Sequence, residues 1–253
     1  MKIKSKIIWN IILIFAIIIF FVSAALLICF FISKDKTDYD KYKNSEISQV
    51  NSENSALADN PINFEALWQQ NTDVYAWINI PSCSIDYPIV QSYEEDDSFY
   101  LHHNLEKQYQ YSGCIYTEKL NKKDFNDRNT VIYGHNMLDG TMFSNLLAYQ
   151  EEAFFNDNPY IYIYMPGHKL TYMIFSAYRY DNRHILNSFD FSNDEVWETY
   201  LEEAKNPKSL VVNKRDVNVT TDDKIITLST CTGSNFEYRY LIQGVLINDE
   251  LTK

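Results

Sequence analysis

The fold is indicated first by two β-rich runs near the C-terminus, KIITLST at residues 224–230 and RYLIQGVLI at residues 239–247. Similar runs rich in Ile, Val, Tyr and Phe occur upstream, at 85–90, 113–117, 130–133, 160–165 and 170–180. Polar turns separate these runs, and long helices do not alternate with them as in a βαβ protein. The spacing predicts a mainly β fold, either an antiparallel barrel or a sandwich.

Three helical segments are expected around the strands. The first begins at Asn60-Pro61, because proline is favourable in the first turn of a helix, and extends to Trp68. The second covers the apolar residues around Leu146. The third begins at Ser192, where Glu195 three residues later completes a capping box.

The N-terminal segment is apolar, and no charged residue occurs from Ile7 to Ile32. This run exceeds the roughly 20 residues of a membrane-spanning helix, whereas a cleaved signal peptide has an apolar region of only about 7 to 15 residues. Lys2, Lys4 and Lys6 precede it without an acid, which places the N-terminus in the cytoplasm and the rest of the chain outside the cell. We expect a cytoplasmic tip and transmembrane anchor (1–33), a polar linker (34–59) and one folded domain (60–253).

The part of the chain beyond the apolar segment is acidic. All 34 acidic residues lie after residue 33, and the whole chain has a formal net charge of −12. Proteins that bind nucleic acids need a basic surface to replace the counterions around phosphates. The sequence therefore excludes a nucleic-acid-binding role.

Four cysteines limit the metal and redox chemistry that the chain can carry. Cys29 lies in the apolar segment, and Cys83, Cys114 and Cys231 follow it. Neither a Cys-x-x-Cys pair nor a Cys/His cluster occurs, so we expect no metal and no cofactor. Cys83 and Cys114 are compatible with a disulfide or with two free thiols, because spacing does not determine pairing. Cys231 is then unpaired, and an unpaired external cysteine is a candidate reactive thiol.

Cys231, His135 and Arg239 are the candidate catalytic residues. Cys231 lies where a strand ends and a polar loop begins, although a buried, inert cysteine is the alternative. His135 follows another apolar strand and Gly134, and an imidazole can activate a thiol. Arg239 begins the last strand, where its guanidinium would bind a carbonyl or an oxyanion unless it forms only a surface salt bridge.

Other ionisable residues have no comparable setting. No acid occupies a clear triad position, so the group that orients His135 is not identified by the sequence. We expect the remaining histidines to be surface or hydrogen-bonded residues; they are His102, His103, His168 and His184.

Several motifs resemble the sortase family. TLSTC at 227–231, followed by Arg239, resembles the family signature, and NTVIYGHNMLDGTMFSNL at 129–146 is similar to the histidine segment of class B members. IDYPIVQ at 85–91 and FYLHHN at 99–104 also resemble class B sequences. The resemblance extends over about residues 62 to 250 and follows an N-terminal apolar segment.

This resemblance implies a closed eight-stranded β-barrel with N-terminal helices and a helix, here Asn193 to Ala204, inserted between the sixth and seventh strands. It also implies a cysteine transpeptidase anchored in the membrane of a Gram-positive bacterium. Such an enzyme cleaves the C-terminal sorting signal of a secreted protein at a threonine carbonyl. An amine of the cell-wall peptide then resolves the thioacyl enzyme.

The resemblance also assigns roles to individual residues. Cys231 would be the nucleophile, His135 the proton shuttle and Arg239 the oxyanion-binding or substrate-binding group. Leu101, Ser229 and Thr230 would line the groove for the sorting signal.

Two alternative functions remain open at this point. A Cys/His peptidase would use the same activation chemistry and let water resolve the acyl enzyme. A noncatalytic, membrane-tethered surface-binding domain would contain Cys231 and His135 as structural residues.

Overall fold

The computed structural model describes residues 2–34, 38–44, 57–232 and 235–253. Contacts divide the chain into two units, Met1–Tyr39 and Asp40–Lys253. The first unit consists mainly of helix α1 (Lys2–Lys34), which covers the predicted transmembrane segment. Among the residues that the structure describes, no helix meets the length and hydropathy expected of a membrane span.

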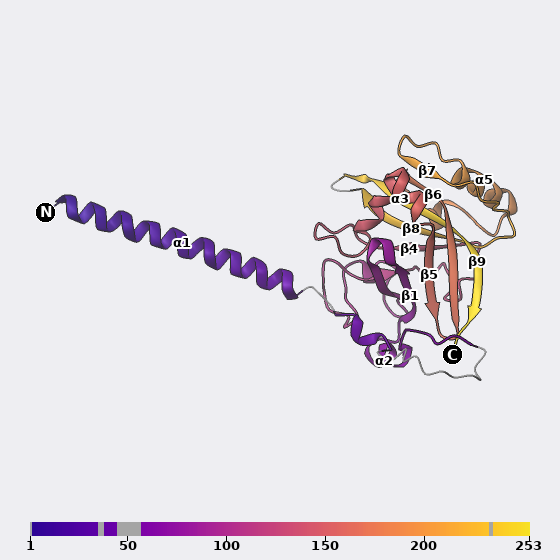
Figure 1. Cartoon of the computed structure of the whole chain (residues 1–253), viewed down its shortest axis with the longest axis horizontal. Coiled ribbons are helices and arrows are strands. Elements are labelled where there is room, and N and C mark those ends of the chain that lie inside the picture. Colours follow the sequence, from indigo (N-terminus) through magenta and orange to yellow (C-terminus); the bar gives the residue numbers. More distant parts are fainter. Residues whose placement is uncertain (1, 35–37, 45–56, 233–234) are drawn as a thin grey trace. The chain divides into compact units, whose positions relative to one another are not determined.

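The second unit is built around a closed β-barrel (Figure 1). In the described part of the chain, eight strands pair in the order β5-β1-β2-β3-β4-β8-β9-β6, and β6 pairs with β5 to close the ring. The barrel strands are β1 (Val74–Ile80), β2 (Ile85–Val90), β3 (Ile115–Tyr116), β4 (Asn129–Tyr133), β5 (Tyr160–Met165), β6 (His168–Asp181), β8 (Ile225–Thr232) and β9 (Asn235–Leu251). A further short strand, β7 (Val212–Lys214), pairs with β6 beyond the end of β5. The prediction of a closed eight-stranded barrel is confirmed.

The strand directions differ from the prediction. The β2–β3 and β4–β8 pairs are parallel, whereas the other pairs are antiparallel. The expectation of a barrel was therefore correct, whereas the expectation that all its strands are antiparallel was wrong. Parallel strands require a long crossover connection, and the chain between β4 and β8 supplies one by passing through β5, β6, β7 and several helices.

The helices lie between or before the strands. They are the α-helices α2 (Phe64–Gln70), α3 (Glu152–Asp157), α4 (Ile185–Ser188) and α5 (Asp194–Lys205), and the 3-10 helices η1 (Asp40–Tyr42), η2 (Pro81–Cys83), η3 (Phe99–Leu101) and η4 (Ser144–Gln150). Helix α5 follows β6, the sixth barrel strand, and precedes β8, the seventh, so the predicted insertion is confirmed. The helix start at Asn60-Pro61 was wrong, because Asn63 caps α2 by accepting the backbone N–H of Ala66 at 3.0 Å.

Two hydrophobic clusters define the inside and the outside of the barrel wall. Ile132 of β4 and Leu228 of β8 belong to the first cluster, which fills the barrel. Val131 of β4 and Leu241 of β9 belong to the second cluster, which packs against Trp197 of α5. Successive strand residues face opposite sides of a sheet. Strand residues that do not point into the barrel therefore form an outer face beside α5.

Candidate active site

The strand register gathers several candidate residues on this outer face. Cys231 lies opposite Arg239 in the antiparallel β8–β9 pair, so their side chains project from the same side. Ser229 lies two residues before Cys231 and pairs with Tyr133 of β4, which in turn pairs with Tyr116 of β3. These residues line one pocket with a volume of about 490 Å³.

Three hydrogen bonds hold the end of β4 against β8. The N–H of Gly134 donates to the carbonyl of Ser229 at 3.2 Å. The hydroxyl of Thr230 donates to the carbonyl of Gly134 at 2.8 Å, and Asn136 Nδ2 donates to the carbonyl of Cys231 at 2.9 Å. These bonds bracket His135, so its backbone is tied to the strand that bears Cys231. No sequence motif had indicated a role for Asn136.

A backbone carbonyl orients His135. Its Nε2 lies 2.9 Å from the carbonyl oxygen of Leu101. A carbonyl only accepts hydrogen bonds, so Nε2 carries the proton of the neutral imidazole and Nδ1 carries the lone pair. The rings of His102 and Tyr111 flank the imidazole, each with its centroid 5.2 Å away. Sequence motifs could not reveal this orienting group, because a carbonyl is common to every residue type.

The environment of His135 favours its neutral form. Burial lowers the pKa of His135 below its ordinary value of 6.5, the Leu101 carbonyl opposes this change, and the charge of His102 adds to it. The imidazole is therefore neutral at neutral pH and can accept a proton from a thiol.

Two glycines shape the neighbourhood of His135. Gly113 has a φ of +58°, and a Cβ atom there would lie only 2.3 Å from the carbonyl oxygen of Leu101. At Gly134, a Cβ atom would lie 2.5 Å from Ile115 Cδ1 and 2.8 Å from the ring of Phe143. A side chain at position 134 would therefore clash with the packed side chains of Ile115 and Phe143.

Arg239 and the predicted substrate-binding residues line the same pocket as Cys231 and His135; these residues are Leu101, Ser229 and Thr230. Arg239 is half-buried, and its Nη1 donates to the carbonyl of Tyr238 at 3.3 Å. Ser229 and Thr230 are only 5% and 2% exposed. The pocket also contains residues for which no sequence motif had predicted a role in the site; they are His102, Tyr116, Glu118, Tyr133 and His184.

Cys83 and Cys114 are buried and free, so no disulfide joins them. Burial raises the pKa of the Cys83 thiol to about 11. Burial also raises the pKa of Cys114 far above its ordinary value. Since a thiolate is the reactive form, neither residue is suited to nucleophilic attack at neutral pH.

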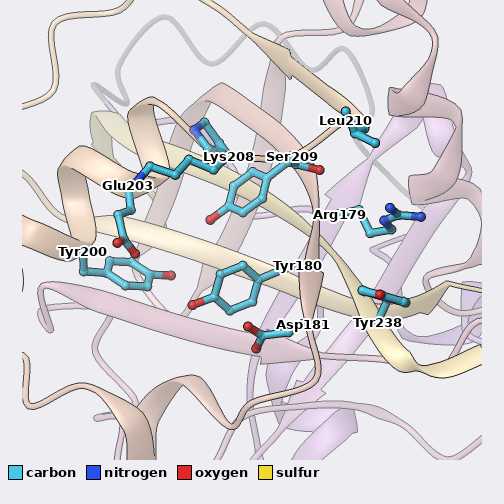
Figure 2. A pocket seen from close by; sticks show the side chains of 11 residues that line it. Arg179, Tyr180, Asp181, Tyr200, Glu203, Lys208, Ser209, Leu210 and Tyr238 are labelled. Carbon is cyan, nitrogen blue, oxygen red and sulfur yellow. The ribbon is translucent and has the colours of Figure 1, made fainter.

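A smaller hollow of about 330 Å³ adjoins the pocket and shares Tyr180 and Asp181 with it. Figure 2 shows Tyr200 and Glu203 of α5 on one side of this hollow, and Tyr180 and Asp181 of β6 on the other. The guanidinium of Arg183 donates hydrogen bonds of 2.6–3.0 Å to both carboxylate oxygens of Asp181.

Comparison with known proteins places these features in a family. The family model described as "Sortase domain" matches residues 78–247. Sortase B of Listeria monocytogenes is 36% identical over 184 residues, which cover 72% of each chain. The X-ray structure of Clostridium perfringens sortase B has 37% identity and a TM-score of 0.66, covering 73% of this chain and 100% of that one. A Staphylococcus aureus sortase B–substrate complex has 31% identity and a TM-score of 0.65, covering 74% of this chain and 85% of that one.

Proposed function

Because the chain belongs to the sortase family and is a class B cysteine transpeptidase, we propose that Cys231 is its nucleophile, His135 its proton shuttle and Arg239 its oxyanion-binding residue. One observation carries this assignment: the register and the hydrogen bonds around His135 bring all three side chains to one pocket. The substrate is the C-terminal sorting signal of a secreted protein.

The first half of the reaction forms a thioester. His135 takes the thiol proton of Cys231 on Nδ1, while the Leu101 carbonyl continues to accept from Nε2 and stabilises the imidazolium. The thiolate attacks the scissile carbonyl, a C–S bond forms, and Arg239 donates hydrogen bonds to the resulting oxyanion. The C–N bond then breaks, and His135 returns the proton to the leaving amine.

The second half transfers the acyl group to an amine of the cell-wall peptide. The amine nitrogen attacks the thioester carbon, Arg239 again binds the oxyanion, and His135 takes the proton that the nitrogen loses. The C–S bond breaks, a new C–N bond remains, and the proton on His135 returns to the sulfur of Cys231. The enzyme is regenerated without a net change.

Leu101, Ser229 and Thr230 are proposed to shape the groove for the sorting signal. All three line the pocket, but Thr230 already uses its hydroxyl to bind the carbonyl of Gly134. We therefore expect Thr230 to act through its shape, and Ser229 to be the more available hydrogen-bonding partner for a substrate.

Mass analysis of the full-length protein tests the assignment. The protein in detergent micelles is incubated with sorting-signal peptides, with and without wall-peptide amines. We expect a thioacyl adduct on Cys231, consumption of this adduct by the amine, and no adduct in Cys231→Ala. An adduct on Cys83 or Cys114 would contradict the nucleophile assignment. A product and rate that do not depend on the amine would instead indicate a peptidase.

We also propose that the segment Ile7–Ile32 anchors the chain in the cytoplasmic membrane and that the domain 60–253 lies outside. The uncharged segment and the preceding lysines support this topology. Residues 34–59 are proposed to form the linker. Within it, Asp40–Asn44 contacts the domain. The N–H of Asn44 donates to the carbonyl of Pro61 at 2.9 Å, and Lys43 forms an ion pair with Asp86.

A further inference from the structure

One wall of the catalytic pocket has no part in the mechanism above. It consists of Tyr116, Glu118 and Tyr133, together with His184, which contacts Glu118. Glu118 is 7% exposed and Tyr116 is 6% exposed. A carboxylate buried to this extent is costly unless a partner compensates its charge.

His184 compensates the charge of Glu118 only in part, because burial raises the pKa of Glu118 more than His184 lowers it. Its Nε2 lies 2.8 Å from Glu118 Oε1, while its Nδ1 accepts the backbone N–H of Asn187 at 3.2 Å, as the N-cap of α4. A ring nitrogen that accepts carries no proton, so Nε2 is the nitrogen that donates to the carboxylate. Glu118 forms no ion pair with a lysine or arginine within the described residues.

The two tyrosines offer hydrogen-bonding capacity beside this carboxylate. Their rings stack with centroids 5.4 Å apart. The Tyr133 hydroxyl is buried without a hydrogen-bond partner among the described residues, and no hydrogen bond joins the Tyr116 hydroxyl to any residue in that part of the chain. Buried polar groups in native proteins are normally satisfied, so the Tyr133 hydroxyl is available to a ligand in this pocket.

The wall adjoins the reacting atoms. Tyr116 pairs with Tyr133, which pairs with Ser229, two residues before Cys231. Burial raises the pKa of Tyr116 and keeps its hydroxyl neutral, and the charges of Glu118 and Arg239 also act on this hydroxyl. A group bound between Glu118 and the phenols therefore shares the pocket with the thioester on Cys231.

We propose that Glu118, Tyr116 and Tyr133 bind the protonated amine of the acyl acceptor. The carboxylate supplies the opposite charge, the hydroxyls accept N–H bonds, and the aromatic faces attract a cation. This inference rests on the proposed function, because a transpeptidase needs an amine as its second substrate. Loss of one proton from the bound ammonium to water exposes the lone pair that attacks the thioester.

Kinetics with triglycine as the amine test the proposal, using the full-length protein in detergent micelles and a sorting-signal peptide as acyl donor. Glu118→Gln removes the charge but keeps an oxygen that accepts from His184. We expect the KM for triglycine to rise about 10-fold, the size expected for loss of one charge-assisted hydrogen bond. Thioester formation in the absence of triglycine is expected to change much less.

Two further variants make the test specific. Glu203→Gln makes the same chemical change at an exposed carboxylate of the adjoining hollow (Figure 2), and its KM for triglycine is expected to equal that of the wild type. His184→Ala removes the bond to Glu118 and retains the carboxylate, so we expect a smaller effect than that of Glu118→Gln.

Three results would overturn the proposal. An equal effect of His184→Ala would mean that Glu118 only ties the β3–β4 loop to the segment before α4. If Glu118→Gln changed the KM for the sorting peptide and not that for triglycine, Glu118 would bind the acyl donor. If only Glu203→Gln changed the KM for triglycine, the amine would bind in the adjoining hollow. Failure of the wild type to form a thioester would instead reject the proposed function.

Discussion

Arg239 lies opposite Cys231 across the β8–β9 pair. As an oxyanion-binding residue, it would use both the charge and the planar shape of its guanidinium. Arg239→Lys keeps the charge and loses the planar fork of donors. We expect kcat/KM for peptide cleavage to fall roughly 100-fold to 1,000-fold, the usual cost of removing an oxyanion donor. The thermal unfolding midpoint is expected to remain nearly unchanged. A loss worth less than about 1 kcal/mol, typical of an exposed ion pair, would remove Arg239 from the catalytic set.

The buried position of His135 predicts a pH dependence of stability. Above its ordinary pKa of 6.5, His135 is neutral in both the folded and the unfolded chain and contributes no pH dependence. As the pH falls below 6.5, the unfolded chain binds the proton first, because the pKa of His135 in the folded protein is lower. The free energy of unfolding therefore decreases.

His135→Asn removes this contribution. We expect the variant to lose less stability than the wild type between about pH 7.5 and about pH 5.5, measured by urea unfolding at both values. The same loss in both proteins would show that His135 titrates normally in the folded state.

Glu118 predicts a pH dependence of stability with the opposite sign to that of His135. Burial raises the pKa of Glu118 above its ordinary value of 4.5, while the bond from His184 opposes the change. The folded protein therefore binds a proton more readily than the unfolded chain, and stability decreases as the pH rises from about 4.5 through the raised pKa.

Glu118→Gln removes the buried charge. We expect its free energy of unfolding at pH 7 to equal or exceed that of the wild type in urea titrations, so a loss of amine binding in this variant would not result from unfolding. A clearly less stable variant would mean that the carboxylate supports the fold.

At the scale of elements, the turn between η3 and β3 supports the active site. It brings the carbonyl of Leu101 to His135, two residues 34 positions apart in sequence. Gly113→Ala would direct a Cβ atom at the backbone oxygens of Tyr100 and Leu101, which cannot move away as a flexible side chain can. We expect a loss of about 1–3 kcal/mol in stability and a lower kcat.

Gly167→Ala is the matched control for this turn. Its φ is +81°, but no atom lies within 4 Å of the added Cβ, so only the cost of the left-handed conformation remains. That cost is about 1–2 kcal/mol, and kcat should not change. Equal kcat in both variants would show that the turn does not position His135.

Local signals predicted the elements better than their ends. A strand was expected at 160–165 and lies there, because an apolar and aromatic run favours strand wherever it packs. Helix α5 instead begins after Asn193, whose side chain accepts from Glu195 and Val196, since the hydroxyl of Ser192 is bound to Asp190. Strand β1 was missed, because its buried run at Val74–Ile80 lies before residue 85, where the first strand was expected.

At the scale of the whole molecule, the proposed topology predicts protease accessibility. If residues 7–32 anchor the chain with its N-terminus in the cytoplasm, protease added outside intact protoplasts is expected to release the domain 60–253. Immunodetection of the N-terminus should then show a short protected fragment, and lysed protoplasts serve as the control for full digestion. Protection of the domain in intact protoplasts would reverse the orientation.

The sequence by itself determined the family, most of the strands and the identity of the candidate nucleophile. Strand runs and the TLSTC motif depend on neighbouring residues, so they can be recognised without the fold. Only the tertiary structure determined the parallel β4–β8 pairing, the Leu101 carbonyl on His135 and the wall around Glu118. These features join segments that are distant in sequence. They also depend on backbone groups and on the burial of side chains, neither of which leaves a pattern in the residue types.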